Sequence, residues 1–318
     1  MILVATSNFF VHKKLFAENL KLGEVNSITS HKLFVGEGAV YSALIIKLMQ
    51  GEPYVLGTAG GINGRFIKNF MDKSRIKSDF LWKETETRSE VNIIDAITGI
   101  STVLLEDNFT VDEQDIKHYK HKFHVNLKDV TTVLINNIPL SDGSSNKLIE
   151  EIISIAKENN QKIIISLSKE ELLASLQHKP YGIVINNNDL GILGIDSSKE
   201  KEWQLNMRNL VKNHSIKYLL YDNIEDENIY LVTKNKITCA KYGKFNQDIE
   251  DRGSKDLLSG ILAVAASRKY EMEKITKLAA AVMGASKASE FPKICQRKEV
   301  DELYKRIKLI TVFDSSKN

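Results

Sequence analysis

The sequence predicts an α/β fold: a doubly wound, mostly parallel sheet with helices on both faces and a small β lid. Three observations predict it. Short β-branched runs alternate with amphipathic stretches along most of the 318 residues, as is typical of a parallel sheet covered by helices. Two separate segments, 13–35 and 89–106, interrupt this rhythm with strand-like alternation. Helical periodicity then continues to the end of the chain.

The alternation defines the elements in order. Candidate strands lie at 2–5, 55–57, 130–135, 162–165, 182–185 and 218–220. Helical candidates lie between them at 39–50, 64–73, 144–159, 169–177 and 200–213. Three helices are expected to close the chain, at 256–267, 271–288 and 297–308.

The two interrupting segments predict a second, smaller sheet. Residues 13–35 alternate like a strand pair around Gly23, and residues 89–106 have the pattern of a hairpin around Gly99. A sheet this small buries too little surface to be stable alone, so we expect it to pack on the core or on a partner. The expected division is a core of 1–12, 36–87 and 108–318, and a lid of 13–35 and 88–107.

Composition argues against several classes of protein. The charge is nearly balanced, with 44 Lys and Arg against 41 Asp and Glu, and no basic tract carries the interleaved aromatics of a nucleic-acid surface. The apolar runs are too short to cross a bilayer. Residues 1–5 lack a basic leader and predict a buried strand. The two cysteines, Cys239 and Cys295, do not form a disulfide framework, so a reducing cytoplasm is expected.

The segment 251–260 predicts an anion site. Gly253 and Ser254 precede an apolar helix that starts near Asp256. Backbone N–H groups at such a start are unpaired and lie at the positive end of the helix dipole. A phosphate group is therefore a suitable ligand for this turn.

Six segments spread over nearly the whole chain carry a resemblance to a known family. They are TSNFFVH at 6–12, KLGEVN at 21–26, VGEGAV at 35–40, GTAGGING at 57–64, ETR at 86–88 and AAAVMGASKA at 279–288. Their order resembles the ribokinase-like superfamily, and more closely its phosphofructokinase-B branch, which contains 1-phosphofructokinase and tagatose-6-phosphate kinase. The resemblance implies ATP γ-phosphoryl transfer to a phosphorylated ketohexose such as fructose 1-phosphate or tagatose 6-phosphate, with ATP and Mg²⁺ as cofactors.

The resemblance also implies site residues. For the substrate they are Asn8, His12, Gly36, Glu37, Gly38 and Arg88; for the cofactor they are Asn187, Arg252 and Ser286. Several depart from the family pattern. His12 replaces a sugar-binding aspartate, Glu37 replaces a phosphate-binding lysine, and Val40 replaces an asparagine. Arg88 keeps its family position, and a guanidinium can bind phosphate oxygens in pairs.

The catalytic segment departs most. The family pattern is G-A-G-D with a helix glycine five residues after the aspartate. Counting back from Gly260 puts Lys255 at the aspartate position, with Gly253 and Ser254 in the anion hole. A slip of one residue brings in Asp256 as a fallback base, but on a helix that slip rotates the side chain by about 100°. A lysine accepts a proton only if burial lowers its pKa by several units.

No metal site is predicted from the chain's own residues. The magnesium-linked N-x-x-E motif of the family aligns with 187–190, where Leu190 replaces the glutamate and Asp189 stands beside it. His118, His121 and His124 share a spacing of three, but the lysines between them predict a solvated surface instead of a metal centre.

These departures predict a sugar-phosphate kinase-like protein with weak or absent activity. One alternative is an active carbohydrate kinase in which Asp256 acts as a relocated base. The other is a non-catalytic small-molecule-binding or regulatory homologue. The expected partner is a sugar phosphate or another small anion. The family also implies a homodimer formed through the β lid, which protects exposed strand edges.

Overall fold

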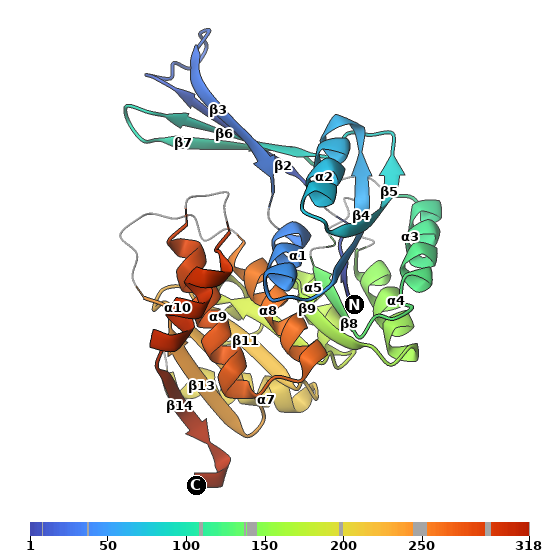
Figure 1. Ribbon diagram of the computed structural model, residues 1–318, viewed down its shortest axis with the longest axis vertical. Helices are drawn as coiled ribbons and strands as arrows, with labels where there is room; N and C mark the ends of the chain where they lie inside the picture. Colours follow the sequence, from blue (N-terminus) through green and yellow to red (C-terminus); the bar gives the residue numbers. More distant parts are fainter. Residues whose placement is uncertain are drawn as a thin grey trace.

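The computed structural model describes residues 1–7, 9–36, 38–107, 111–136, 138, 145–196, 200–243, 253–289 and 294–317. Its larger sheet has ten strands in the order β14-β13-β12-β11-β10-β9-β8-β1-β4-β5 (Figure 1). Every neighbouring pair from β5 to β11 is parallel, and β12, β13 and β14 continue the sheet antiparallel. The strands are β1 Ile2–Ala5, β4 Pro53–Gly60, β5 Lys77–Lys83, β8 Thr132–Asn136, β9 Lys162–Ser166, β10 Gly182–Asn186, β11 Tyr218–Asn223, β12 Asn228–Val232, β13 Lys236–Lys241 and β14 Leu309–Asp314.

Helices cover both faces of this sheet (Figure 1). One apolar core lies under α1, α2, α8, α9 and α10, and a second lies under α3, α4, α5 and α7. Strand side chains alternate between the two cores because successive residues point to opposite faces. The helices are α1 Ala39–Leu48, α2 Gly61–Lys73, α3 Glu113–Val125, α4 Ser145–Glu158, α5 Lys169–Leu176, α6 Asn187–Leu190, α7 Glu200–Asn213, α8 Ser254–Arg268, α9 Met272–Lys287 and α10 Arg297–Arg306, followed by the 3-10 turn Ser315–Lys317.

A second sheet of four strands projects from the core (Figure 1). Its order is β3-β2-β6-β7, with β2 parallel to β6 and antiparallel to β3, and β6 antiparallel to β7. The strands are β2 Val11–Ala17, β3 Ile28–Val35, β6 Ser89–Asp95 and β7 Ser101–Leu105. The predicted fold class, a large mostly parallel sheet between helices with a small second sheet, is confirmed.

Close packing of α1 against α8 fixes where α8 begins. A Cβ atom on Gly260 would lie 2.8 Å from the backbone oxygen of Ser42 and 3.0 Å from Ile45. The Ser42 hydroxyl donates to the Asp256 backbone oxygen at 2.9 Å and lies 2.9 Å from the Ser259 hydroxyl. The first turn of α8 is therefore held against the start of α1.

The prediction that helices close the chain is wrong for its last residues. After α10 the chain forms β14, which pairs antiparallel with β13 at the sheet edge. The run 309–313 (LITVF) is rich in β-branched and aromatic residues, which is the sequence signal for this strand. The strands β5, β12 and β13 and the helix α3 were also missed. Within the described residues, no helix is both long and apolar enough to span a membrane.

Candidate ligand-binding site at the start of α8

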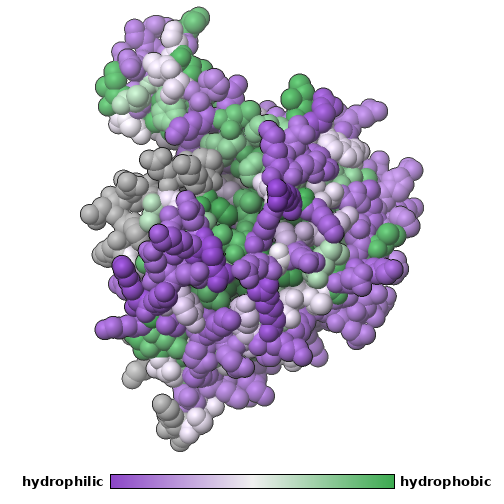
Figure 2. Space-filling view, in the orientation of Figure 1, coloured by the Kyte–Doolittle hydropathy of each residue, from purple (hydrophilic) through white to green (hydrophobic). Residues whose placement is uncertain are grey.

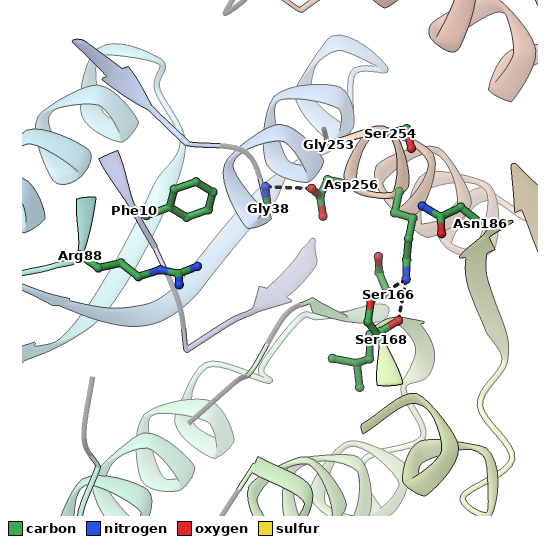
Figure 3. A pocket seen from close by; sticks show the side chains of 11 residues that line it. Phe10, Gly38, Arg88, Ser166, Ser168, Asn186, Gly253, Ser254 and Asp256 are labelled. Atoms are coloured by element: carbon green, nitrogen blue, oxygen red, sulfur yellow. Dashed lines mark hydrogen bonds between the residues drawn. The ribbon is translucent and has the colours of Figure 1, made fainter. Parts of the chain in front are cut away.

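A cavity of about 260 Å³ opens at the carboxyl ends of the parallel strands, beside the first turns of α1 and α8. Ligands of open α/β sheets bind at this edge. Its lining residues come from the ends of β9 and β10, from the positions directly before the lid strands β2 and β6, and from the starts of α1 and α8 (Figure 3). The lining residues are Phe10, Gly38, Arg88, Ser166, Leu167, Ser168, Asn186, Gly253, Ser254, Lys255 and Asp256.

The start of α8 has the backbone shape of an anion site. Gly253 is the N-cap residue, has left-handed φ 81° and supplies no side-chain cap. Glycine adopts this conformation without steric cost. The hydroxyl oxygens of Ser254 and Ser166 are buried and have no hydrogen-bond partner among the residues that the structure describes. A buried hydroxyl normally has a partner, so these two groups favour a polar ligand.

Lys255 turns away from α1 and into the sheet. Its Nζ lies 2.7 Å from a carboxylate oxygen of Asp189, in an ion pair whose side chains are 13% and 3% exposed. It also donates to the Leu167 carbonyl at 2.7 Å and to the Ser168 hydroxyl at 3.0 Å. An ammonium group has three N–H donors, and these three acceptors match them. Asp189 accepts a further bond from the Asn186 backbone N–H at 3.0 Å.

Asp256 turns the other way, toward α1 (Figure 3). One carboxylate oxygen accepts from the backbone N–H of Gly38 at 3.0 Å, and the other accepts from the Asn136 side-chain amide at 2.8 Å. Gly38 is the N-cap residue of α1, with φ 78°. The carboxylate therefore joins the starts of α1 and α8 to the end of β8, although it also lines the cavity.

The cavity is bounded on the lid side by Arg88 and Phe10. The guanidinium carbon of Arg88 lies 5.0 Å from the centre of the Phe10 ring, within the range of a cation–π contact. Arg88 directly precedes β6, so the lid strand places its positive charge at the cavity. Lys255 matches the charge of Asp189, so Arg88 brings a positive charge on the lid side and the Asp256 carboxylate a negative charge on the α8 side.

The structure brings together six of the predicted site residues. Those that line the cavity are Gly38, Arg88, Gly253, Ser254, Lys255 and Asp256. Predictions for Asn8, Glu37 and Arg252 lie outside the described residues.

Two predicted substrate residues lie beside the cavity without lining it. His12 is buried between the rings of Phe10 and Phe34, with centroids 4.8 and 5.0 Å away, and its Nδ1 is 3.2 Å from a carboxylate oxygen of Glu90. Gly36 packs under Phe10, because a Cβ there would lie 2.6 Å from that ring. Both shape the aromatic wall of the cavity.

The two remaining cofactor predictions also fall elsewhere. The side-chain oxygen of Asn187 accepts from the Ile224 backbone N–H at 2.9 Å, and its amide donates to Asn223 at 3.3 Å. It therefore ties α6 to the turn after β11. Ser286 lies in α9 beside Cys295: burial raises the pKa of that thiol to about 11, and the Ser286 hydroxyl opposes the rise.

The strand end shifts the motif by one residue. β10 ends at Asn186, which forms a reciprocal capping box with Asp189. Counted from Asn186, the motif is N-x-x-D and ends at Asp189. The sequence alone had aligned it one residue later, from Asn187 to Leu190. The missed lining residues Ser166 and Asn186 are the last residues of β9 and β10, and that position was the signal that could have identified them.

The residues present do not fit a divalent metal ion. The Asp189 carboxylate, the acid nearest the motif position, is bound to an ammonium and to a backbone N–H. Across the described residues no group of three or more His, Cys, Asp or Glu side chains is placed to hold a metal. His118 and His121 lie on α3, beside a separate hollow next to β5.

Comparison with known proteins places the fold. No family model matches the chain. It is 25% identical over 191 residues to "1-phosphofructokinase" of Bacillus subtilis, which covers 60% of this chain and 61% of the relative. It is 24% identical over 212 residues to "D-tagatose-1-phosphate kinase" of Klebsiella oxytoca, covering 66% of this chain and 68% of the relative.

Solved structures match over nearly the whole chain. Phosphofructokinase-2 of Escherichia coli has a TM-score of 0.85 at 13% identity, covering 96% of this chain and 98% of that one. A Staphylococcus aureus protein assigned as a phosphofructokinase has a TM-score of 0.82 at 18% identity, covering 99% and 100%. The fold is thus that of these phosphofructokinases, and the resemblance seen in the six sequence segments is confirmed.

Proposed function

We propose that this chain binds a phosphorylated ketohexose in the cavity at the start of α8 and transfers phosphoryl groups weakly or not at all. The observation that carries the proposal is the buried ion pair of Lys255 with Asp189. Counting back from Gly260 assigns Lys255 to the position of the proton acceptor in the kinases that the sequence resembles, and this ion pair holds its ammonium in place. The curated relatives, named for kinases of fructose and tagatose phosphates, supply the ligand class.

The cavity suits the phosphate of such a ligand. The first turn of α8 presents its positive end there, and Arg88 adds a full positive charge. The buried hydroxyls of Ser166 and Ser254 can bind oxygens of the phosphate or the sugar. Charge and hydrogen-bonding capacity therefore favour binding.

The same residues disfavour transfer. A kinase needs a carboxylate to take the proton of the attacking hydroxyl. The Lys255 ammonium already donates to three oxygens and has no lone pair to accept a proton. A positioned acid or base contributes typically about 10²–10⁴-fold in rate, so its loss slows transfer by that order.

A second candidate is an active kinase that uses Asp256 as its base, with ATP and Mg²⁺ as cofactors. The specific observation in its favour is that Asp256 lines the cavity. Against it, both oxygens of that carboxylate accept hydrogen bonds, from Gly38 and Asn136. These two hydrogen bonds hold the carboxylate toward α1, although each oxygen keeps a second lone pair.

Paired binding and turnover measurements separate the two candidates. Calorimetric titration of the wild-type protein with fructose 1-phosphate, tagatose 1-phosphate and tagatose 6-phosphate is expected to show binding of at least one. With Mg-ATP and the bound sugar phosphate, ADP release is expected to stay far below the ~1–100 s⁻¹ typical of kinases. Turnover in that range supports the Asp256 candidate, and no binding of any sugar phosphate refutes the proposed ligand class.

We also propose that the chain pairs with a second copy through the lid. Cross-strand register places Leu33, Val91 and Leu104 in one row on one face of the four-stranded sheet, with the exposed Lys13 between Leu33 and Val91. Leu15 and Ile93 lie two residues along on the same face. Leu33 and Leu104 are 50% and 55% exposed, and Figure 2 shows hydrophobic side chains on this projecting part. A second copy would cover this apolar face and the edge strands.

A further inference from the structure

We infer that the Lys255 ammonium stands in for a divalent cation, so that the cavity binds its phosphate ligand without a metal ion. The inference deepens the proposed function and rests on it for the ligand class. The ammonium is surrounded by three oxygens of different kinds, from the Asp189 carboxylate, the Leu167 carbonyl and the Ser168 hydroxyl, at 2.7, 2.7 and 3.0 Å. Carboxylate, carbonyl and hydroxyl oxygens are the ligands that hard cations prefer.

The positive charge is fixed in place from both sides. Lys255 belongs to the first turn of α8, and its partner Asp189 is almost fully buried and held by the Asn186 N–H. A divalent cation that approached the same oxygens would meet the ammonium at contact distance and be repelled. The ammonium of Lys255, which is part of the chain, thereby takes the place of an exchangeable divalent cation.

This replacement predicts which phosphates bind. A free phosphate monoester needs only positive charge and donors, which the Arg88 guanidinium and the α8 turn supply at the cavity, while the Lys255 ammonium donates to its three protein oxygens. A Mg-nucleotide carries its own divalent ion, which would compete with Lys255 for Asp189. The cavity should therefore prefer metal-free phosphate monoesters to Mg-nucleotide complexes.

Metal dependence of binding tests the inference directly. Fructose 1-phosphate, or whichever of the three sugar phosphates binds, is titrated into the wild-type protein in MgCl₂ and then in EDTA. The two Kd values are expected to agree within about twofold. Binding that weakens about tenfold or more in EDTA, a difference of about 1.4 kcal/mol, overturns it.

Manganese provides a second readout that needs no sugar ligand. Electron paramagnetic resonance of wild-type protein titrated with Mn²⁺ is expected to show no bound ion that depends on Asp189. Lys255→Met, which keeps the side-chain volume and removes the charge, is expected to gain one bound Mn²⁺. Asp189→Asn combined with Lys255→Met is expected to lose it again.

The outcomes are decisive in both directions. Stoichiometric Mn²⁺ binding by the wild type that disappears in Asp189→Asn overturns the inference even if Lys255→Met fails to fold. A folded Lys255→Met protein that gains no Mn²⁺ also overturns it. If no sugar phosphate binds, the proposed function fails, while the manganese result still decides whether Lys255 occupies a cation site.

Discussion

Lys255 and Asp256 are neighbours in the chain, yet their side chains leave the first turn of α8 in different directions, toward Asp189 and toward Gly38. Successive helical residues are rotated by about 100°, so Lys255 reaches the ends of β9 and β10 while Asp256 reaches α1. The charge next to β9 and β10 therefore depends on which of the two side chains, the Lys255 ammonium or the Asp256 carboxylate, points toward these strands. The contacts of these two residues, more than their identities, decide what the cavity can do.

At the same scale, the two cysteines are expected to be unreactive. Burial raises the pKa of Cys239 and of Cys295 to about 11, so at pH 8 both thiols stay protonated in the folded protein. The thiolate is the reactive form, so iodoacetamide at pH 8 should label native protein very slowly and label it more quickly only as the pH approaches 11. Guanidinium-unfolded protein is the control and should be labelled at both positions. Rapid stoichiometric labelling of native protein at pH 8 would contradict this.

Among the elements, the contact between α1 and α8 positions the cavity. Gly260→Ala places a Cβ 2.8 Å from the Ser42 carbonyl oxygen, and relieving that overlap should cost about 1–3 kcal/mol of unfolding free energy. Urea unfolding measures it. Gly191→Ala is the matched control, since it has right-handed φ and no atom within 4 Å of its Cβ. Equal stability of the two variants would show that the helices have room to separate.

The lid sheet carries the prediction about assembly. Leu33→Asp and Leu104→Asp each place a charge on its apolar face, so either change should convert a dimer into a monomer in analytical ultracentrifugation. Lys32→Asp is the control, because its side chain points to the opposite face of β3. A wild-type protein that is monomeric at micromolar concentration, or variants that remain dimeric, would refute lid-mediated pairing.

For the molecule as a whole, the architecture was largely predictable and the chemistry of the site only in part. Strand and helix periodicity predicted the two sheets because burial on one or both faces imposes it. The α8 turn was predictable from Gly253 and Ser254, a local signal. The strands β12 and β13 were missed because their short runs follow β11 without a helix between them, and β14 was missed because its short run directly follows α10.

Contacts between distant residues explain what the sequence did not reveal. The acceptors of Lys255 lie 66 to 88 residues earlier in the chain, and the donors to Asp256 lie 120 and 218 residues earlier. No local pattern encodes such pairs. The N-x-x-D motif starts at Asn186 and not at Asn187, and only the end of β10 at Asn186 in the structure reveals this shift.

We propose that Lys255 stands at the position of the catalytic base and that its presence there prevents phosphoryl transfer. Comparing Mg-ATP-dependent ADP release by the wild type and by Lys255→Asp, with saturating sugar phosphate, tests it most directly. Lys298→Asp, a charge change at an exposed lysine in the first turn of α10, is the control. We expect near-zero turnover for the wild type and the control, and a rise of about 10²-fold or more for Lys255→Asp. Wild-type turnover of ~1–100 s⁻¹, or no rise in a Lys255→Asp protein that still binds both ligands, would contradict it.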